Sequence, residues 1–238
     1  MIPKIIHYCW FGNKKMPLKF KRYIKTWKKH CPDFELKLWN EQNYDLNQNE
    51  FIKEAARQNK WAFVTDFVRL DVIEKYGGIY LDTDVELIKP LTPLLNHKAF
   101  AGFECYDYVN FGLIVGAEPH NEIIKEMVDY YKTLTFTEES LKTQTCPIIQ
   151  TNILMKHGLT KDSTEQEIEG FHIYPPEYFC PMNYYQIMDN FTKNTYSIHH
   201  YAASWFNTKD RIKFKLGNFK RKTKHNIKMF IKKMLRME

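Results

Sequence analysis

The hydrophobic pattern of this chain changes repeatedly between the period of a strand and that of a helix. Residues 5–11 form an apolar run, which predicts a buried first strand that ends at Gly12 and Asn13. Residues 34–39 alternate apolar and charged side chains, which predicts a second strand. The basic stretch 18–30 between them predicts a helix closed by Pro32.

The next part of the chain continues this alternation of elements. Residues 51–76 have helical spacing and predict two helices that end at Gly77 and Gly78, because a left-handed C-cap favours glycine. Short apolar runs then predict strands, and a further amphipathic stretch predicts a helix; the strands are 79–81, 85–88 and 111–115, and the helix is 121–131. Strands alternating with helices predict an α/β domain with a mixed, mainly parallel sheet.

The composition indicates an ordered globular domain and argues against a disordered or membrane-spanning chain. The chain has 238 residues, of which 44% are hydrophobic and 16% aromatic, enough for one ordered domain with a sizeable core. A mean hydropathy of −0.53 and the lack of an apolar run of about 18 residues argue against a spanning helix. The first residues lack a basic segment followed by a long apolar one, so we expect no secretory signal and a cytoplasmic protein.

The cysteines and the charges are distributed unevenly. The five cysteines are scattered without a metal-binding spacing, so we expect reduced, mostly buried thiols. Residues 209–238 contain twelve of the 35 Lys and Arg but only two of the 28 Asp and Glu. The sequence thus predicts a slightly acidic domain over 1–208 and a separate basic tail over 209–238.

The tail itself has the pattern of an amphipathic helix from about residue 218 to 236. Its apolar residues recur on one helical face and its basic residues cover the rest; the apolar ones are Ile227, Phe230, Ile231, Met234 and Leu235. We expect this helix to dock on an anionic membrane surface, which would make the protein peripheral on the inner face of the cell membrane. The alternative is that its apolar face packs on the domain.

Candidate chemistry is concentrated at residues 76–85. Paired glycines end a helix, a short apolar strand follows, and Asp82 and Asp84 then stand at i and i+2 at the carboxyl end of that strand, where α/β sheets bind ligands. Burying two unpaired carboxylates would be costly, and a hard divalent cation such as Mn²⁺ or Mg²⁺ removes that cost. A solvated acidic turn is the alternative for an isolated Asp-x-Asp.

The segment 76–84, YGGIYLDTD, resembles the signature of glycosyltransferase family 32, the DXD-containing sugar transferases, which also resemble the clostridial glucosylating toxins distantly. Matching segments run from residue 2 to residue 205. The resemblance implies a GT-A fold, with a Rossmann-like mixed sheet flanked by helices, and a nucleotide sugar held through Mn²⁺ or Mg²⁺. It implies that Asp84 binds the metal directly, that Asp82 reaches ribose, sugar and metal-bound water, and that Tyr80 lies beside the nucleotide.

The same resemblance assigns roles upstream of this signature. Residues 65–69, TDFVR, match a family segment in which Asp66 grips hydroxyls of the donor sugar and Arg69 faces sugar and diphosphate. These two residues share one face of a helix at i and i+3. Residues 7–12, HYCWFG, match the segment that receives the base, where Trp10 stacks on it and the backbone of Cys9 bonds its edge.

Downstream, the family resemblance adds residues that line and close the pocket. It places Asn110 and, on a looser match, Asn152 beside the donor sugar. Residues 198–205, IHHYAASW, match a closing motif in which Ser204 and Trp205 cover the diphosphate. A histidine here supplies a third metal ligand, for which we take His200, with His199 as the alternative.

Together with the carboxylate pair, the resemblance implies a metal-dependent, retaining glycosyltransferase. We expect it to move a hexose from a UDP-sugar to a glycan or lipid-linked saccharide in surface polysaccharide (capsule) synthesis, with no dedicated protein base. A GDP-mannose donor and a toxin-like effector acting on a protein are the alternatives. A non-enzymatic nucleic-acid-binding protein would explain the basic tail, but it leaves Asp82 and Asp84 without a role, so we expect no nucleic-acid partner.

Overall fold

The structure is a computed structural model that describes residues 1–104, 107–137, 145–183, 187–188, 190–202, 216–218 and 223. Its main sheet has seven strands in the order β2-β1-β3-β6-β5-β8-β7. Their bounds are β1 Ile5–Cys9, β2 Glu35–Trp39, β3 Gly78–Tyr80, β5 Ala99–Gly102, β6 Val115–Ala117, β7 Gln166–Ile168 and β8 Phe171–Tyr174. A second sheet pairs β4, Val85–Leu87, with β9, Ser197–His199.

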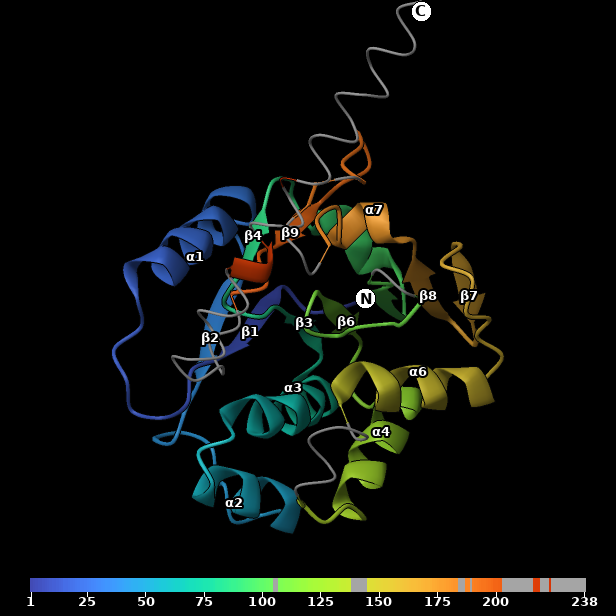
Figure 1. The fold of residues 1–238 in the computed structure, drawn as a ribbon. Coiled ribbons are helices and arrows are strands. Elements are labelled where there is room, and N and C mark those ends of the chain that lie inside the picture. The colour runs from blue at the N-terminus through green and yellow to red at the C-terminus, as the bar shows by residue number, and fades with distance from the viewer. Residues whose placement is uncertain are drawn as a thin grey trace, which may run out of the picture.

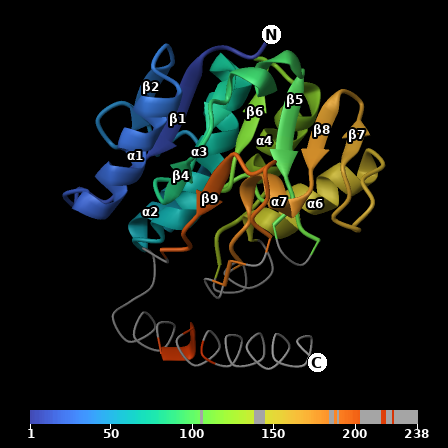
Figure 2. The ribbon, with the colours of Figure 1, turned by 90° about the horizontal axis from the view of Figure 1, so that it is seen from above.

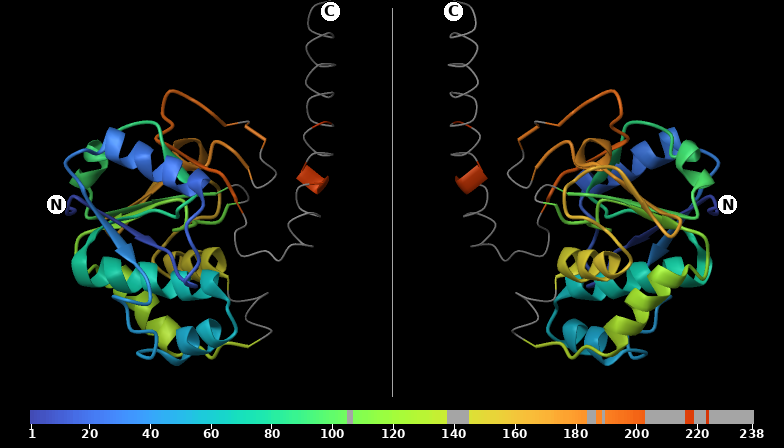
Figure 3. Two further views of the ribbon diagram at one scale, coloured as in Figure 1. Left: turned by 90° about the vertical axis from the view of Figure 1, so that its left-hand side faces the viewer. Right: turned by 90° about the vertical axis from the view of Figure 1, so that its right-hand side faces the viewer.

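Helices cover both faces of the seven-stranded sheet and give three layers (Figures 1 and 3). One face carries α2 (Glu50–Arg57), α3 (Trp61–Tyr76), α4 (Glu122–Lys132) and α6 (Cys146–Lys156). The other carries α1 (Leu18–His30), the short helix η1 (Thr92–Asn96) and α7 (Pro176–Phe179). Within the described residues, no helix is both long and apolar enough to cross a bilayer.

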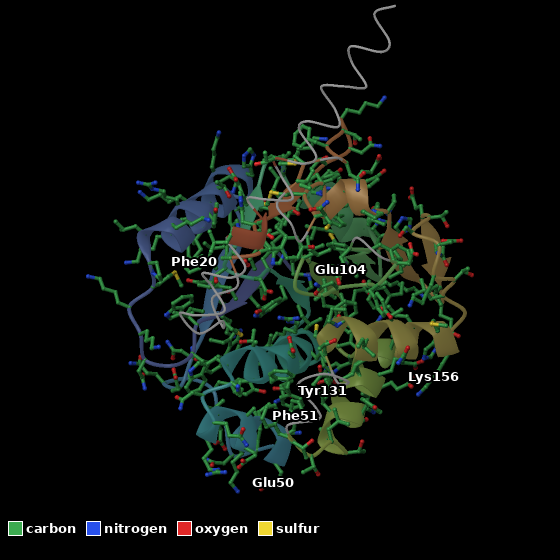
Figure 4. All side chains as sticks on the ribbon, in the orientation of Figure 1. Phe20, Glu50, Phe51, Glu104, Tyr131 and Lys156 are labelled. Atoms are coloured by element: carbon green, nitrogen blue, oxygen red, sulfur yellow. The ribbon has the colours of Figure 1, made fainter. Side chains whose placement is uncertain are left out.

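A hydrophobic core fills each side of the sheet. Phe51 of α2 and Tyr131 of α4, labelled in Figure 4, meet edge to face with ring centroids 5.4 Å apart. On the opposite side Trp27 of α1 is fully buried and its indole N–H donates to the carbonyl of Val85 at 2.8 Å. The α3 helix lies deep in the first core and is buried on nearly all sides, which allows it to carry polar side chains into the interior.

The two sheets meet near α1. Figure 2 shows β4 and β9 side by side across the face of the main sheet, beside α1. In this pairing Val85 lies opposite His199 and Leu87 opposite Ser197, and the backbone N–H of His200 donates to the carbonyl of Asp84 at 3.0 Å. A segment near residue 200 is therefore held beside the residues that follow β3.

The structure confirms most of the predicted elements and corrects two expectations. The α/β class and the mixed sheet are confirmed, but the sheet is not mainly parallel: β6 and β7 pair only antiparallel to their neighbours. The strand predicted over 111–115 is wrong, because residues 111–113 form a turn and β6 begins at Val115. Most of the tail 209–238, including its apolar residues, lies outside the described residues, so the amphipathic helix and the division at 208/209 stay predictions.

Candidate functional site

Asp82 and Asp84 lie at the carboxyl end of β3, where the chain turns toward β4. The turn is closed by the Val85 N–H, which donates to the carbonyl of Asp82 at 3.0 Å. The side chain of Asp84 accepts the backbone N–H of Ala202 at 2.7 Å. The two carboxylates therefore face the segment that follows β9.

His199 is the histidine that joins these aspartates. Its Nε2 lies 3.1 Å from Asp84 Oδ1 and 4.0 Å from Asp82 Oδ2, and its ring is buried. His200, our first choice for the third metal ligand, points elsewhere: its Nε2 lies 2.8 Å from Glu86 Oε2 and its ring stacks on Tyr23 at 4.3 Å. The structure thus brings together Asp82, Asp84 and His199 and leaves His200 outside this cluster.

Strong electrostatic coupling ties His199 to Asp84. Burial alone would raise the pKa of the Asp84 carboxyl, but the charge and hydrogen bond of His199 lower this pKa to about 2. Burial would likewise lower the pKa of His199, and the two aspartates instead raise it to about 9. Nδ1 of His199 is buried and has no hydrogen-bond partner among the described residues.

Arg69 of α3 links the aspartate pair to Asp66. Its guanidinium lies 3.1 Å from Asp82 Oδ1 and 3.1 Å from Asp66 Oδ1. It also lies over the ring of Tyr80 and donates to the sulfur of Cys146 at 2.8 Å, while the Tyr80 hydroxyl donates to Asp82 at 3.0 Å. The predicted group of Asp66, Arg69, Tyr80 and Asp82 is therefore contiguous in the structure.

Burial sets the protonation of this network. Burial raises the pKa of Asp66 to about 6 although Arg69 opposes it, and burial also raises the pKa of Asp82. Two carboxyl groups with raised pKa values lie around one arginine, so keeping both ionised costs free energy when no ligand is bound. Such an arrangement is typical of a functional site.

The predicted base-binding residues lie at the carboxyl end of β1, next to β3 and its Tyr80. Cys9 is buried at the end of the strand. Trp10 follows it, with its ring 5.4 Å from that of Phe20 and its indole N–H donating to the carbonyl of Lys14 at 2.5 Å. Trp10 is half-buried and lines a cavity of about 360 Å³ between β1, β2 and α1.

Asn110 lies in the turn next to Asp82 and is held by Glu104, a residue that the sequence patterns did not indicate. The Asn110 amide donates to Glu104 at 2.8 Å and its Oδ1 accepts the Gly112 N–H at 2.7 Å. A Cβ on Gly112 would come within 2.6 Å of Asp82 Oδ2, so this turn approaches the aspartate as closely as only glycine permits. Burial raises the pKa of Glu104, which is labelled near the centre of Figure 4, despite hydrogen bonds from Asn110 and Tyr201 and the charge of His199.

Besides His200, three of the predicted residues are not placed in this site by the described part of the chain. Asn152 is exposed on α6, whereas the preceding Gln150 and Thr151 are buried and accept backbone N–H groups of Phe111 and Val109. Gln150 and Glu104 are the residues that our sequence reasoning missed. Gln150 belongs to the loosely matching segment 150–152, in which only Asn152 was assigned a role. Ser204 and Trp205 lie outside the described residues.

The residues present fit a divalent cation. Asp82, Asp84 and His199 can each offer one ligand atom, and these atoms lie within 4.8 Å of one another. Two carboxylates and one imidazole suit Mn²⁺ by ligand type, and Mg²⁺ by the carboxylates. In the structure the Nε2 of His199 faces the carboxylates of Asp84 and Asp82. A bound cation would take the place of these direct contacts between the imidazole and the carboxylates.

Comparison with known proteins agrees with this geometry. Residues 17–101 match the family described as "Glycosyltransferase sugar-binding region containing DXD motif". The solved structure "PaToxG Glycosyltransferase" matches 65% of this chain and 68% of its own with a TM-score of 0.50 and 20% identity, a likeness of fold. The described residues thus have the fold of a GT-A glycosyltransferase domain. Over residues 17–101 the chain carries the DXD sugar-binding region, which confirms the resemblance predicted from the sequence.

Curated relatives extend the match to different degrees. Inositol phosphoceramide mannosyltransferase 3 of Schizosaccharomyces pombe is 38% identical over 111 residues, 42% of this chain and 29% of that protein. Uncharacterized glycosyltransferase L373 of Acanthamoeba polyphaga mimivirus is 24% identical over 196 residues, 78% of this chain and 75% of that protein. The chain therefore spans less than a third of the mannosyltransferase and three quarters of the viral protein.

Proposed function

We propose that this chain is a metal-dependent, retaining glycosyltransferase that moves a hexose from a UDP-sugar to a glycan or lipid-linked saccharide. The observation that carries the proposal is the cluster of Asp82, Asp84 and His199, joined through Arg69 to Asp66 at the carboxyl end of β3. The match to the DXD sugar-binding region supports the same reading.

In this proposal Asp82, Asp84 and His199 hold the cation, and Asp66 and Arg69 orient the donor. A bound Mn²⁺ or Mg²⁺ supplies charge stabilisation for the departing diphosphate. Arg69, already fixed between Asp66 and Asp82, adds a second positive charge, and Ser204 with Trp205 closes over the phosphates. Tyr80, Cys9 and Trp10 contact the nucleotide, and Asn110, held by Glu104, lines the sugar. No residue is assigned as a base, since the departing phosphate takes the acceptor proton.

Substitutions in the cation cluster test this function. Asp84→Ala should lower Mn²⁺-dependent UDP-sugar hydrolysis by more than about 100-fold, because even residues behind a metal ligand cost about 10- to 100-fold when changed. His199→Ala should have the same effect, with loss of Mn²⁺-dependent UDP binding in calorimetry. His200→Ala and Glu86→Ala are matched controls, since these residues pair with each other outside the cluster. Wild-type rates in Asp84→Ala would show that the metal assignment is wrong.

The donor nucleotide has one alternative. The fission yeast relative is named as a mannosyltransferase, which favours GDP-mannose as the second candidate donor. The preference for uracil rests on the resemblance of Trp10 and its neighbours to the family's base-binding segment, since an indole by itself can stack on either base. Thermal unfolding with UDP, GDP and their sugars, each with and without Mn²⁺, separates the two. A larger Mn²⁺-dependent stabilisation by GDP would replace UDP in this proposal.

We further propose that the tail 209–238 docks on an anionic leaflet and keeps the enzyme peripheral on the inner membrane face. Its charge pattern supports this role, with about 1 kcal/mol for each basic residue near the surface. Replacing Lys228, Lys232 and Lys233 by Gln should weaken binding to vesicles with 30% anionic lipid by about 100-fold. Co-sedimentation measures this, and equal binding by both proteins would contradict the membrane role of the tail.

A further inference from the structure

The outward face of α1 carries a concentration of positive charge that no described residue balances. The sequence contains no acidic residue from Gly12 to Pro32. In the helix itself, the exposed basic side chains are Lys19, Lys21, Arg22, Lys25, Lys28 and Lys29. No ion pair joins any of them to a described acidic side chain, whereas most lysines that flank the opposite core are paired.

Helical spacing sorts α1 into two opposite faces. Phe20, Tyr23 and Trp27 are buried against the sheet. Leu18, Arg22, Lys25 and Lys29 recur at i, i+4, i+7 and i+11 and form one stripe on the other side, which we name the outer stripe. Leu18 at its N-terminal end is 73% exposed, a large aliphatic side chain among cations.

The residues that line two cavities show the excess of positive charge beside α1. The cavity between α3 and α4 is lined by three lysines, but Asp71, Glu74 and Asp129 line it as well. The larger cavity beside α1 is also lined by three lysines, Lys21, Lys25 and Lys28, and by no carboxylate. Its other lining residues are apolar or aromatic, such as Met16 and Ile24. The α1 side of the molecule is thus both cationic and apolar.

The outer stripe begins at the same edge of the sheet as the cation cluster. β1 and β3 are parallel, so the segment after Cys9, which leads into α1, leaves the sheet at the edge where Asp82 follows Tyr80. The buried face of α1 packs beside the segment that carries the third cluster residue, because Tyr23 stacks on His200, which follows His199 in the chain. A surface bound to the first turns of α1 would therefore lie beside the edge of the sheet that carries Asp82 and Asp84.

We propose that the outer stripe of α1 docks on an anionic phospholipid surface. The docking would bring the carboxyl-end edge of the sheet, with the cation cluster, close to that surface. Cations around an exposed aliphatic side chain suit the headgroup boundary, where phosphates pair with lysines and Leu18 enters the apolar layer. A single-stranded nucleic acid would instead require exposed aromatic side chains for stacking, and the outer stripe has none. The docking does not depend on the transfer reaction, although it would give that reaction a membrane-held acceptor.

Vesicle binding by the full-length chain tests the outer stripe. The triple variant Arg22→Gln, Lys25→Gln, Lys29→Gln should bind vesicles of 30% phosphatidylglycerol in phosphatidylcholine about 100-fold more weakly, at about fivefold for each basic residue. The matched control is Lys98→Gln, Lys125→Gln, Lys132→Gln, which removes the same charge from exposed positions elsewhere and should lower affinity less than about threefold. Pure phosphatidylcholine vesicles should bind none of the three proteins well.

Leu18→Ser separates a membrane from a soluble polyanion. This variant keeps every charge and should weaken vesicle binding about tenfold, while binding to dextran sulfate stays unchanged. Thermal unfolding checks that each variant is folded. Equal vesicle binding by the wild type and the triple variant would overturn the proposal, as would equal losses in the triple variant and its control. The proposal would also be overturned if the triple variant lost dextran sulfate binding while Leu18→Ser left vesicle binding unchanged. That result would assign the outer stripe to a soluble polyanion.

Discussion

Asp66 shows how a buried side chain can serve a ligand at the expense of the fold. Asp66 belongs to α3, and its buried carboxyl group lies 3.1 Å from the guanidinium of Arg69. Burial raises the pKa of this carboxyl group to about 6. A raised carboxyl pKa means that the folded state binds more protons than the unfolded state between about pH 4 and pH 6. Ionised Asp66 therefore destabilises the fold at neutral pH, and the proposed contact with sugar hydroxyls explains why it is there.

Asp66→Asn should separate activity from stability. Removing the charge should lower turnover at least about 100-fold while UDP binding stays within about threefold, since Asp66 is proposed to contact the sugar and not the base. The same change should raise the free energy of unfolding at pH 7 by up to about 3 kcal/mol, the equivalent of the pKa shift. Urea unfolding at pH 7 and pH 4 checks the sign, because the gain should vanish at pH 4. A loss of stability at pH 7 would mean that Asp66 supports the structure.

The residue scale also shows what a motif can and cannot predict. Asp82 and Asp84 were placed correctly from a strand followed by two carboxylates, because chain direction alone puts them at the sheet edge. His200 was taken ahead of His199 as the third ligand, but neighbouring residues of an extended chain face opposite ways, and it is His199 that faces Asp84. Which of them faces Asp84 depends on the register of β9 against β4, a pairing of segments more than a hundred residues apart. Glu104 was missed for a different reason, because its contact with Asn110 depends on a local loop conformation that has no sequence periodicity.

At the scale of elements, the turn between α3 and β3 fixes where the aspartates stand. Gly77 and Gly78 both have positive φ, and a Cβ on Gly78 would lie 2.8 Å from the carbonyl of Ile5. The local pattern was sufficient to predict this turn. It was not sufficient at 111–115, where the apolar run resembles a strand but the Asn110 side chain and carbonyl accept the N–H groups of Gly112 and Leu113 and form a turn instead.

His7 ties this turn to two strands and should give stability a pH dependence. Its Nε2–H donates to the carbonyl of Gly77 at 2.9 Å, and its Nδ1 accepts the indole N–H of Trp39 at 3.0 Å. Burial lowers the pKa of His7 to about 4. The unfolded chain binds the proton at about pH 6.5, so this contribution is complete above pH 6.5 and is lost as the pH falls toward 4.

The loss attributable to His7 should reach about 3 kcal/mol at pH 4. His7→Gln should remove this part of the pH dependence, because Gln can both donate to Gly77 and accept from Trp39 without titrating. Urea unfolding at pH 7, 5.5 and 4.5 measures the slope in each protein. Parallel slopes in the two proteins would show that other groups cause the acid sensitivity.

At the scale of the whole molecule, the site is assembled from three distant segments. α3 supplies Asp66 and Arg69, the turn after β3 supplies the aspartates, and the segment 199–202 closes over them. The last segment is held by the short pairing of β9 with β4 and by two N–H bonds to Asp84. Its strand β9 belongs to the two-stranded sheet and not to the seven-stranded one, so its local opening should require less free energy than opening of the main sheet.

Cation binding should therefore stabilise the segment 197–202 more than the rest of the chain. Opening this segment removes His199 from the cluster, so Mn²⁺ at about 100 times its Kd should slow amide exchange of His200 and Ala202 by up to about 100-fold. Hydrogen–deuterium exchange measures this, and the β7–β8 hairpin serves as an internal control, because it lies at the far edge of the sheet. In Asp84→Ala the protection should be absent. Uniform slowing across the chain, or none at residues 197–202, would mean that this segment does not contribute a ligand to the cation.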